Sequence, residues 1–373
     1  MHFQLGSFRL RFIAINRSLG ANCQMPTLPF RILPAFLFVA ACLDVFCQTP
    51  SVGGLPKDPV VLMSLGLEKN GLNSADARPW HIRGSYTLYN KDGKAEDNGV
   101  YEEWWVSATK YKRTFTSQHL TQTEYATGAG LFRDGSQDWL GSEIALRSSL
   151  IEPLPAITPG EFTFKQHTES EGKSKLTCVS LTYPMRSNLA ISSNFLPMYC
   201  FEPTVPVLRL SSTGSPFRTI YNQIVLFQGH YLARELSTYT ADLKRFDLTV
   251  DEIQTMTQMP DSFPDPPANA LPVDLTTISF TADYARYGAV QLLKKAVPVY
   301  PQAAKDRRIQ GTVVIKALIE KDGHVEKMNV TDGPMELRQA ALDAAGQWVY
   351  RPFIVIGEPR VVEVEIKLTF TMG

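Results

Sequence analysis

The sequence predicts an α+β protein with two folded parts. The first is an N-terminal antiparallel β-rich region that forms a curved sheet or half-barrel, and the second is a small C-terminal domain of β-hairpin, helix and β-strand. Three observations predict this arrangement. Apolar residues alternate with period two in many short runs between Trp80 and about residue 253. Five prolines at 260, 264, 266, 267 and 272 indicate an extended linker. A strand pattern, a helical stripe and a last strand follow it.

The first 47 residues are typical of an export signal. Arg31 precedes a short apolar core, residues 32–41, which has the length of a signal-peptide core rather than of a membrane-spanning helix. Val39-Ala40-Ala41-Cys42 resembles the lipobox of bacterial lipoproteins, which implies lipidation of Cys42. The alternatives are ordinary cleavage near Cys47 and a signal anchor that is retained. Lipidation implies an outer-membrane anchor, ordinary cleavage implies the periplasm, and a retained signal anchor implies the inner membrane.

An extension, residues 48–79, leads to the β-rich domain, residues 80–253. Its apolar patch at 60–65 fits either a strand or a short helix. Two short strands are expected around Asp134-Gly135, and a helix from Glu143 to Ile151 is expected to lie across the sheet. The other strands are expected at residues 82–89, 99–106, 110–116, 120–126, 162–167, 175–183, 198–201, 207–212, 219–227 and 231–238. One curved antiparallel sheet or partial barrel of about eight to eleven strands is expected to form from these runs.

Two cysteines, Cys178 and Cys200, lie outside the export segment, each near a strand-like run. In an exported chain this pattern indicates one disulfide, and a pair of free buried thiols is the alternative.

The β-rich region also faintly resembles, in pattern only, the half-barrel of bacterial lipoprotein carriers. That resemblance implies an apolar ligand cavity lined by Tyr86, Trp104 and Phe115. Aromatic residues at strand spacing more often fill a core, so a packed core is the preferred interpretation.

The linker is expected over residues 254–290 and the C-terminal domain over residues 291–373. Residues 311–320 alternate as a strand, Asp322-Gly323 provides a hairpin turn, and residues 325–330 return. Leu337, Ala341, Ala344 and Trp348 then form one helical stripe. A turn at residues 357–359 precedes the last strand, residues 360–371.

These spaced signals, from Tyr300-Pro301 through Trp348 and Pro352 to Gly357 and the last strand, resemble the C-terminal domain of TonB energy transducers. The resemblance implies a binding module whose last strand pairs with an extended segment of an outer-membrane transporter. The domain opens with Pro298-Val299-Tyr300-Pro301, which we call the opening motif. The partner-binding residues implied are Val361, Glu363, Glu365 and Lys367 on the edge of the last strand, with Pro298 and Tyr300 of the opening motif nearby. A proline at Glu365 is expected to weaken binding, and an exposed edge permits strand-paired homodimers.

The composition argues against several function classes. Lysine plus arginine equals aspartate plus glutamate at 37 each, which gives no reason to expect nucleic-acid binding. We find no spacing typical of a metal site, a cofactor fingerprint or a nucleophile elbow, so no enzyme, metal or cofactor is predicted. Glu102 and Glu103 are adjacent in a strand and therefore point to opposite faces. The prediction is a cell-envelope binding or scaffold protein linked to TonB-dependent transport. The alternative is a carrier of a hydrophobic ligand that uses the C-terminal domain as a docking handle.

Overall fold

The computed structural model describes residues 54–74, 76–156, 160, 162–171, 174–182, 197–213, 217–259, 263–280 and 289–372. They belong to one compact unit, residues 52–373. Residues 1–47, which were expected to form an export signal and which include Cys42, lie outside the described residues. None of the helices among the described residues is both long enough and apolar enough to cross a membrane.

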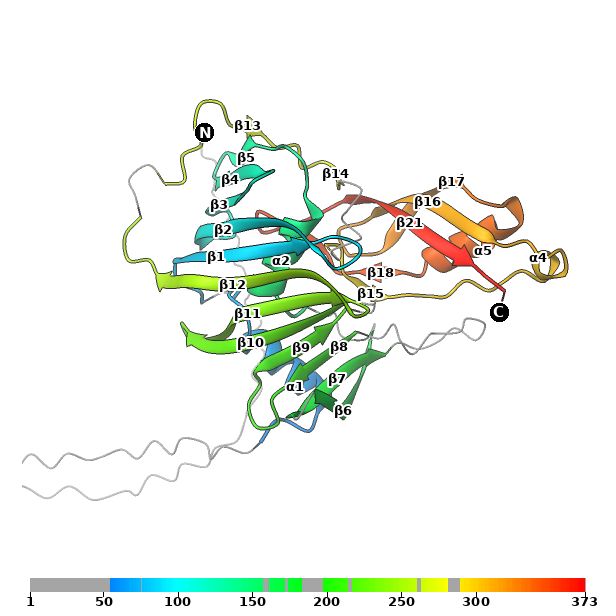
Figure 1. The fold of residues 1–373 in the computed structure, drawn as a ribbon, viewed down its shortest axis with the longest axis horizontal. Coiled ribbons are helices and arrows are strands. Elements are labelled where there is room, and N and C mark those ends of the chain that lie inside the picture. The colour runs from blue at the N-terminus through cyan, green and yellow to red at the C-terminus, as the bar shows by residue number, and fades with distance from the viewer. Residues whose placement is uncertain are drawn as a thin grey trace, which may run out of the picture. The chain divides into compact units, whose positions relative to one another are not determined.

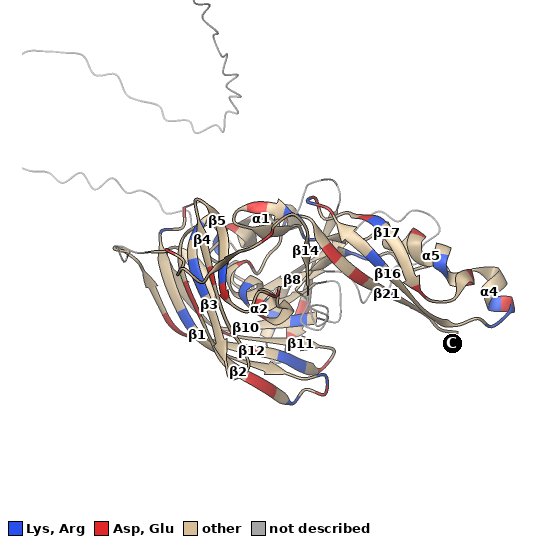
Figure 2. Ribbon diagram, turned by 90° about the horizontal axis from the view of Figure 1, so that it is seen from above, with Lys and Arg blue, Asp and Glu red and all other residues tan. Residues whose placement is uncertain are grey.

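One large antiparallel sheet forms the N-terminal part, and Figure 2 shows it curving about the helix α2 (Gly141–Ile151). This confirms the predicted curved sheet. Its strand order is β13-β5-β4-β3-β2-β1-β12-β11-β10-β9-β8-β7-β6. The bounds are β1 Trp80–Tyr89, β2 Ala95–Ser107, β3 Lys110–Ser117, β4 Thr121–Thr127, β5 Gly130–Gly135, β6 Thr163–Glu171, β7 Ser174–Thr182, β8 Met198–Phe201, β9 Leu208–Ser212, β10 Phe217–Phe227, β11 His230–Thr240, β12 Leu243–Thr255 and β13 Leu271–Pro272.

Two helices pack against this sheet. The helix α1 (Pro59–Lys69) contacts β6, β7 and β11, and α2 contacts β11 and β12. Asp58 caps α1 by accepting a hydrogen bond from the Val60 amide at 2.8 Å, and Pro59 supplies a pre-set φ for the first turn. The apolar patch at 60–65 is therefore helical. Gly66 lets α1 approach Phe201, since a Cβ there would lie 2.6 Å from the ring.

The structure corrects two expectations for the sheet. Residues 130–140 contain one strand, β5, rather than two. It ends at Gly135 (φ 86°), where the chain turns and the Ser136 amide donates to the Thr121 carbonyl. The strand β12 was not predicted at all. It fills the centre of the sheet between β1 and β11, so the sheet contains more strands than expected.

The C-terminal part is a four-stranded sheet in the order β14-β21-β16-β17, with the helix α5 (Met335–Ala345) packed on it. The predicted hairpin, helix and last strand are all present (Figure 1). Short elements complete this part. Their bounds, with those of the sheet, are β14 Ile278–Ser279, β15 Leu292–Lys294, α4 Gln302–Asp306, β16 Gly311–Ile319, β17 Val325–Asp332, β18 Val349–Tyr350, β19 Phe353–Val355, β20 Glu358–Arg360 and β21 Val362–Phe370.

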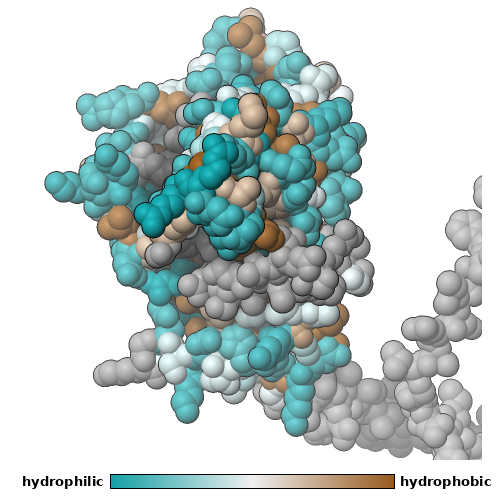
Figure 3. All heavy atoms as spheres, turned by 90° about the vertical axis from the view of Figure 1, so that its right-hand side faces the viewer, coloured by the Kyte–Doolittle hydropathy of each residue, from teal (hydrophilic) through white to brown (hydrophobic). Residues whose placement is uncertain are grey.

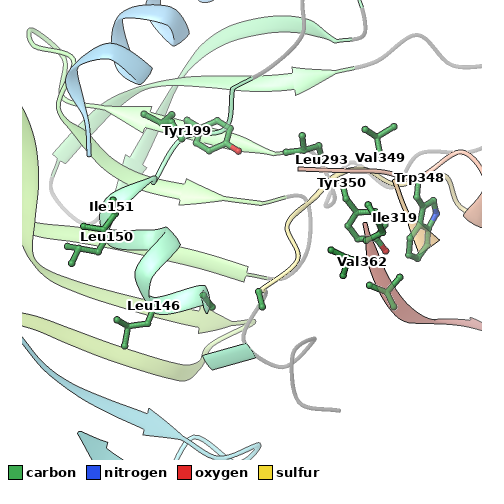
Figure 4. Packing of buried hydrophobic residues seen from close by; sticks show 14 of the residues in the cluster. Leu146, Leu150, Ile151, Tyr199, Leu293, Ile319, Trp348, Val349, Tyr350 and Val362 are labelled. Atoms are coloured by element: carbon green, nitrogen blue, oxygen red, sulfur yellow. The ribbon is translucent and has the colours of Figure 1, made fainter. Parts of the chain in front are cut away.

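The hydrophobic core follows from strand alternation and from the helical stripe. Figure 4 shows Leu146, Leu150 and Ile151 on α2, and Trp348 near Ile319 and Val362 in the C-terminal part. Most buried apolar residues of both parts belong to one contiguous hydrophobic cluster. A small separate cluster surrounds the paired cysteines and contains Leu176, Cys178, Cys200 and Leu210. The Trp348 indole also donates to the Ala296 carbonyl at 2.8 Å, which ties the entry of the C-terminal part to its core.

Part of the segment expected to be a linker has strand partners. The strand β12 runs to Thr255, β13 pairs with β5, and β14 pairs with β21. The described part of this segment is therefore attached to the large sheet through β12 and β13, and to the C-terminal part through β14.

Candidate functional site

The last strand, β21, has two different sides. On one side it pairs antiparallel with β16 from Val362 to Phe370. On the other side β14 runs parallel to it, with Ile278 opposite Val362 and Ser279 opposite Glu363. Within the described parts of the chain, β14 is the only strand on this second side, and its ladder ends at Glu363. We call this second side the β21 edge.

The main-chain groups that face the β21 edge belong to alternate residues. The Ile278 amide donates to the Val361 carbonyl at 3.0 Å, so Val361 directs its carbonyl to this side. Since successive residues of a strand direct their amide and carbonyl groups to opposite sides, Glu363, Glu365 and Lys367 face the same side as Val361. Four of the six residues expected from the sequence thus share one edge.

The side chains of these residues lie on the solvent face of the strand. Val362, Val364, Ile366 and Leu368 are buried, whereas Glu365 and Lys367 are exposed and form an ion pair at 2.9 Å. The solvent face of β21 thus carries two acidic residues, Glu363 and Glu365, followed by one basic residue, Lys367 (Figure 2). The C-terminal face seen in Figure 3 is mostly hydrophilic, with scattered hydrophobic residues. Partner recognition on this face would rely on main-chain pairing rather than on a large apolar patch.

Pro298 and Tyr300 have a different placement. The Tyr300 ring meets Phe370 at the end of β21 in an edge-to-face contact, with ring centroids 5.5 Å apart. Its hydroxyl donates to the Ile309 carbonyl. Tyr300 thus holds the opening motif against the strand, which is a positioning role. Pro298 is half-buried two residues before it.

The concave face of the large sheet contains a chain of alternating charges that sequence reasoning missed. Successive ion-pair distances are 2.7, 2.9, 2.8, 2.9, 3.1 and 3.2 Å. It begins on β5 and ends in the C-terminal part. We call it the arginine–glutamate chain, and its members in order are Arg133, Glu124, Arg113, Glu103, Arg147, Glu152 and Arg351.

The members of this chain compensate one another electrostatically. Glu103 is fully buried and accepts hydrogen bonds from Arg113, Arg147 and the Tyr101 hydroxyl. Burial would raise the pKa of Glu103, but the two guanidinium groups outweigh burial and lower its pKa to about 2. Burial would also raise the pKa of Glu124, but the guanidinium groups of Arg133 and Arg113 outweigh burial and lower this pKa. Both carboxylates are therefore charged at neutral pH.

A cavity of about 100 Å³ lies beside the arginine–glutamate chain. Its walls include Phe115 and Trp139 from the sheet part, and Phe353 from the C-terminal part. The Arg133 guanidinium stacks over Trp139 at 3.9 Å, and Arg351 donates to the Glu152 carbonyl at 2.8 Å. The cavity is much smaller than the roughly 300–1,000 Å³ of a drug-sized ligand site and its walls carry paired charges. This geometry does not suit a lipid.

The three aromatic residues expected to line an apolar cavity are not brought together. Tyr86 and Phe115 are buried on the inner face, with ring centroids 6.2 Å apart. Trp104 lies on the outer face, because it alternates with the inward-facing Trp105 along β2. The cavity lined by all three residues, which the carrier resemblance implied, is therefore wrong, since Trp104 is separated from the others by the sheet. Tyr86 and Phe115 belong to the hydrophobic core, in agreement with the preferred interpretation.

An apolar groove of about 370 Å³ lies instead between α1 and β6. Met63 and Leu67 line it from α1, and Phe162 and Phe164 line it from the other side. Leu67 is 42% exposed. Sequence reasoning missed this groove because residues 60–65 were not assigned to a helix, and the facing apolar residues lie about 100 positions further along the chain.

Cys178 and Cys200 lie opposite each other on β7 and β8 and form a disulfide, with Cα atoms 4.0 Å apart. Among the described residues, no three His, Cys, Asp or Glu side chains lie close enough together to hold a metal ion.

Comparison with known proteins identifies the C-terminal part. Residues 296–372 match the family described as Gram-negative bacterial TonB protein C-terminal. The curated Protein TonB of Vibrio cholerae serotype O1 is 32% identical over 77 residues, which are 20% of this chain and 32% of that protein. The match spans about a third of the relative's length. Residues 296–372 are thus similar in sequence to the C-terminal region of TonB proteins.

Solved structures resemble the sheet part only distantly. A LolA superfamily protein from Nitrosomonas europaea has a TM-score of 0.35 and 10% identity, with 56% of this chain and 97% of that chain covered. A putative outer membrane lipoprotein-sorting protein domain from Vibrio parahaemolyticus has a TM-score of 0.32 and 7% identity, with coverages of 50% and 88%. At these scores the likeness carries no functional argument.

Proposed function

We propose that this protein is a non-catalytic binding protein of the bacterial cell envelope, whose C-terminal region recognises a partner by accepting an extended segment along the β21 edge. The observation that carries the proposal is the parallel pairing of β14 with β21. It indicates that this side of β21 accepts an added strand.

The proposed partner segment pairs with β21 beyond Glu363, alongside Lys367 and Thr369. Strand addition satisfies main-chain amide and carbonyl groups of both chains, and it requires little side-chain complementarity. The polar face around β21 fits such a mode of recognition. The proposed partner is an exposed segment of an outer-membrane transporter, which would link the protein to TonB-dependent transport. A second copy of the chain is the other candidate for the added strand.

Two variants at one position test this proposal. Lys367→Pro removes a main-chain donor on the β21 edge and leaves the donors that face β16 in place, whereas Lys367→Ala removes only the side chain. We expect the proline variant to lose at least about tenfold in affinity for the partner recovered from native envelopes, because about 1 kcal/mol is lost per hydrogen bond and register is disturbed. The alanine variant should bind within about threefold of the wild type.

Thermal unfolding of both Lys367 variants controls for damage to the fold. Equal affinity of Lys367→Pro and the wild type, with both folded, would show that the partner uses another surface.

The second candidate function is transport of a hydrophobic ligand, and the apolar groove between α1 and β6 favours it. Its volume falls within the range of small-molecule sites, and its walls are mainly aliphatic and aromatic. The proposed ligand site therefore lies at α1 rather than at Tyr86, Trp104 and Phe115.

Uptake of a fluorescent fatty acid by delipidated protein tests the carrier function. Leu67→Asp places a charge in the groove and should weaken uptake at least about tenfold, since an apolar contact is replaced by a group that must be desolvated. Leu226→Asp is the matched control, because Leu226 is 69% exposed on β10 and does not line the groove. Absence of uptake by the wild type, or equal loss in both variants, would exclude a carrier function at this groove.

A further inference from the structure

The outer face of the large sheet carries an ordered row of side chains that neither proposed function uses. Strand register places Trp104 beside His81 on one neighbouring strand and beside Lys112 on the other. Lys112 is in turn beside Tyr125, and Tyr125 is beside Phe132. Five adjacent strands, from β1 to β5, thus present one cross-strand row that is mostly aromatic. We call it the outer aromatic row.

The proline-rich segment lies over this row and leaves a groove beneath it. Phe263, Pro264, Asp265 and Pro267 form one wall, and the sheet forms the other. The Phe263 and Trp104 ring centroids are 6.5 Å apart. The groove has a volume of about 390 Å³, within the roughly 300–1,000 Å³ of small-molecule sites. Its sheet wall is formed by Glu102, Trp104, Lys112 and Tyr125.

The groove combines ring faces with few polar groups. Trp104 is partly buried, and its ring packs against the His81 ring with centroids 4.2 Å apart. The Lys112 ammonium lies 5.7 Å from the centre of the Tyr125 ring. Glu102 is held by His81 Nε2 at 2.7 Å, and the other His81 nitrogen contacts Gln254 at 3.2 Å. The Glu102 carboxylate therefore has a fixed orientation at the groove. Asp265 is exposed on the opposite wall.

The charges of the groove favour neither a strong anion nor a strong cation. Glu102 is already hydrogen-bonded to His81, which leaves Asp265 and Lys112 as one charge of each sign at the groove. A neutral ligand with several hydroxyl groups fits better, because carboxylates accept hydrogen bonds and the ammonium donates them. The aromatic faces carry negative partial charge, which attracts the weakly positive C–H groups of a flat ring.

We infer that this groove is a glycan-binding site, which takes one or two neutral pyranose rings stacked on Trp104 with hydroxyl groups at Glu102 and Lys112. The site is separate from the β21 edge, so it binds independently of the proposed partner segment. It would give the protein a second attachment point, to a polysaccharide rather than to a protein.

Indole N–H signals from protein labelled with ¹⁵N test this inference, because the five tryptophans give separate side-chain probes. The soluble probes are cellotetraose, the tetramer of N-acetylglucosamine, and glucose. A glycan site predicts that the Trp104 signal shifts in a saturable manner with at least one tetramer. The tetramer that binds distinguishes a plain hexose chain from an N-acetylated one, and saturation by glucose alone would indicate a free-sugar site.

Three variants make the test specific. Trp104→Ala should weaken binding about tenfold, near the upper limit for one aromatic contact, and Trp104→Phe should retain most of it. Phe263→Ala should also weaken binding, and it lies outside the sheet, so it leaves the strands intact. Tyr239→Ala is the matched control, since Tyr239 also contacts a lysine ammonium but is not in the groove.

Two results would overturn the glycan site. One is the absence of any saturable shift at Trp104 with all three probes. The other is equal binding by Trp104→Ala, Phe263→Ala and Tyr239→Ala, which would place the glycan elsewhere.

Discussion

The buried carboxylate of Glu103 gives the sharpest test of how the sheet part is stabilised. The side chain is 0% exposed and lies between the guanidinium groups of Arg113 and Arg147. Glu103→Gln keeps the size of the side chain but removes the charge, so both arginines lose a partner inside the fold. Breaking a buried ion pair from one side costs about 3–5 kcal/mol. Arg113 retains Glu124 and Arg147 retains Glu152, which favours the lower end of this range.

The pKa of Glu103 gives an independent estimate. Its folded value of about 2 lies below its ordinary value of 4.5, so the group contributes stability above pH 4.5 and loses it as the pH falls towards 2. The difference corresponds to about 3 kcal/mol. Both estimates agree within the accuracy of either.

The assay is thermal unfolding of wild type and Glu103→Gln at pH 7 and pH 3. At pH 7 the variant should melt roughly 4–8 °C lower. At pH 3 the gap should narrow, because the unfolded wild type binds a proton at Glu103 that the folded wild type largely does not, which lowers the stability of the wild type. The neighbouring Glu102→Gln is the control, since Glu102 is 35% exposed on the outer face and should shift the midpoint by at most about 2 °C. Equal midpoints for the two variants at pH 7 would refute the reasoning.

Two further predictions concern other parts of the sheet. Reduction of the Cys178–Cys200 disulfide, which closes a separation of 22 residues, should lower the free energy of unfolding by about 3 kcal/mol in denaturant titration, and a Cys178→Ser variant should no longer respond to reductant. Gly66→Ala should destabilise by about 1–3 kcal/mol, despite the better helix propensity of alanine, because its Cβ would overlap the buried Phe201 ring. Gly128→Ala, where the added methyl group meets nothing within 4 Å, should be nearly neutral by the same measurement, and equal effects of the two alanines would contradict the steric argument.

Local signals account for the part of the fold that was predicted. The helix expected at Glu143–Ile151 corresponds to α2, and the strand expected at residues 311–320 corresponds to β16. In both segments the apolar residues recur with the period of the predicted element, and the sequence marks where the element begins and ends. The helix α5 ends at Ala345, before Trp348 of the predicted stripe and earlier than the expected end at residues 350–352. Gly346 closes it, and the Trp348 amide donates to the Ala345 carbonyl in a turn.

Elements that depend on distant partners were not predictable in the same way. The strands β13 and β14 have two residues each, and each forms only because another strand accepts it. The strand β12 contains three acidic residues, Asp247, Asp251 and Glu252, which hid its alternation of Phe246, Leu248 and Val250. In β12, as in β13 and β14, pairing with strands that are distant in the sequence stabilises the element, and local sequence patterns do not reveal such pairing.

The arginine–glutamate chain was missed because charged residues are usually assigned to the solvent face. A signal was nevertheless present in the sequence. Glu103 lies between Tyr101 and Trp105 at the inward phase of β2, and Arg113 lies between Tyr111 and Phe115 at the inward phase of β3. Opposite charges at the buried phase of two adjacent strands indicate a buried ion pair, and this reasoning was available before the structure.

Recognition of a partner at the β21 edge is the central claim, and site-specific cross-linking in the native envelope tests it most directly. A photo-reactive amino acid is placed at Lys367 on β21 or, as the control, at Lys327, which is exposed on β17 at the opposite edge of the same sheet. We expect a defined cross-linked product from Lys367 alone, with the partner peptide mapped by mass spectrometry to an extended segment. Cross-links from Lys327 and none from Lys367 would contradict the account.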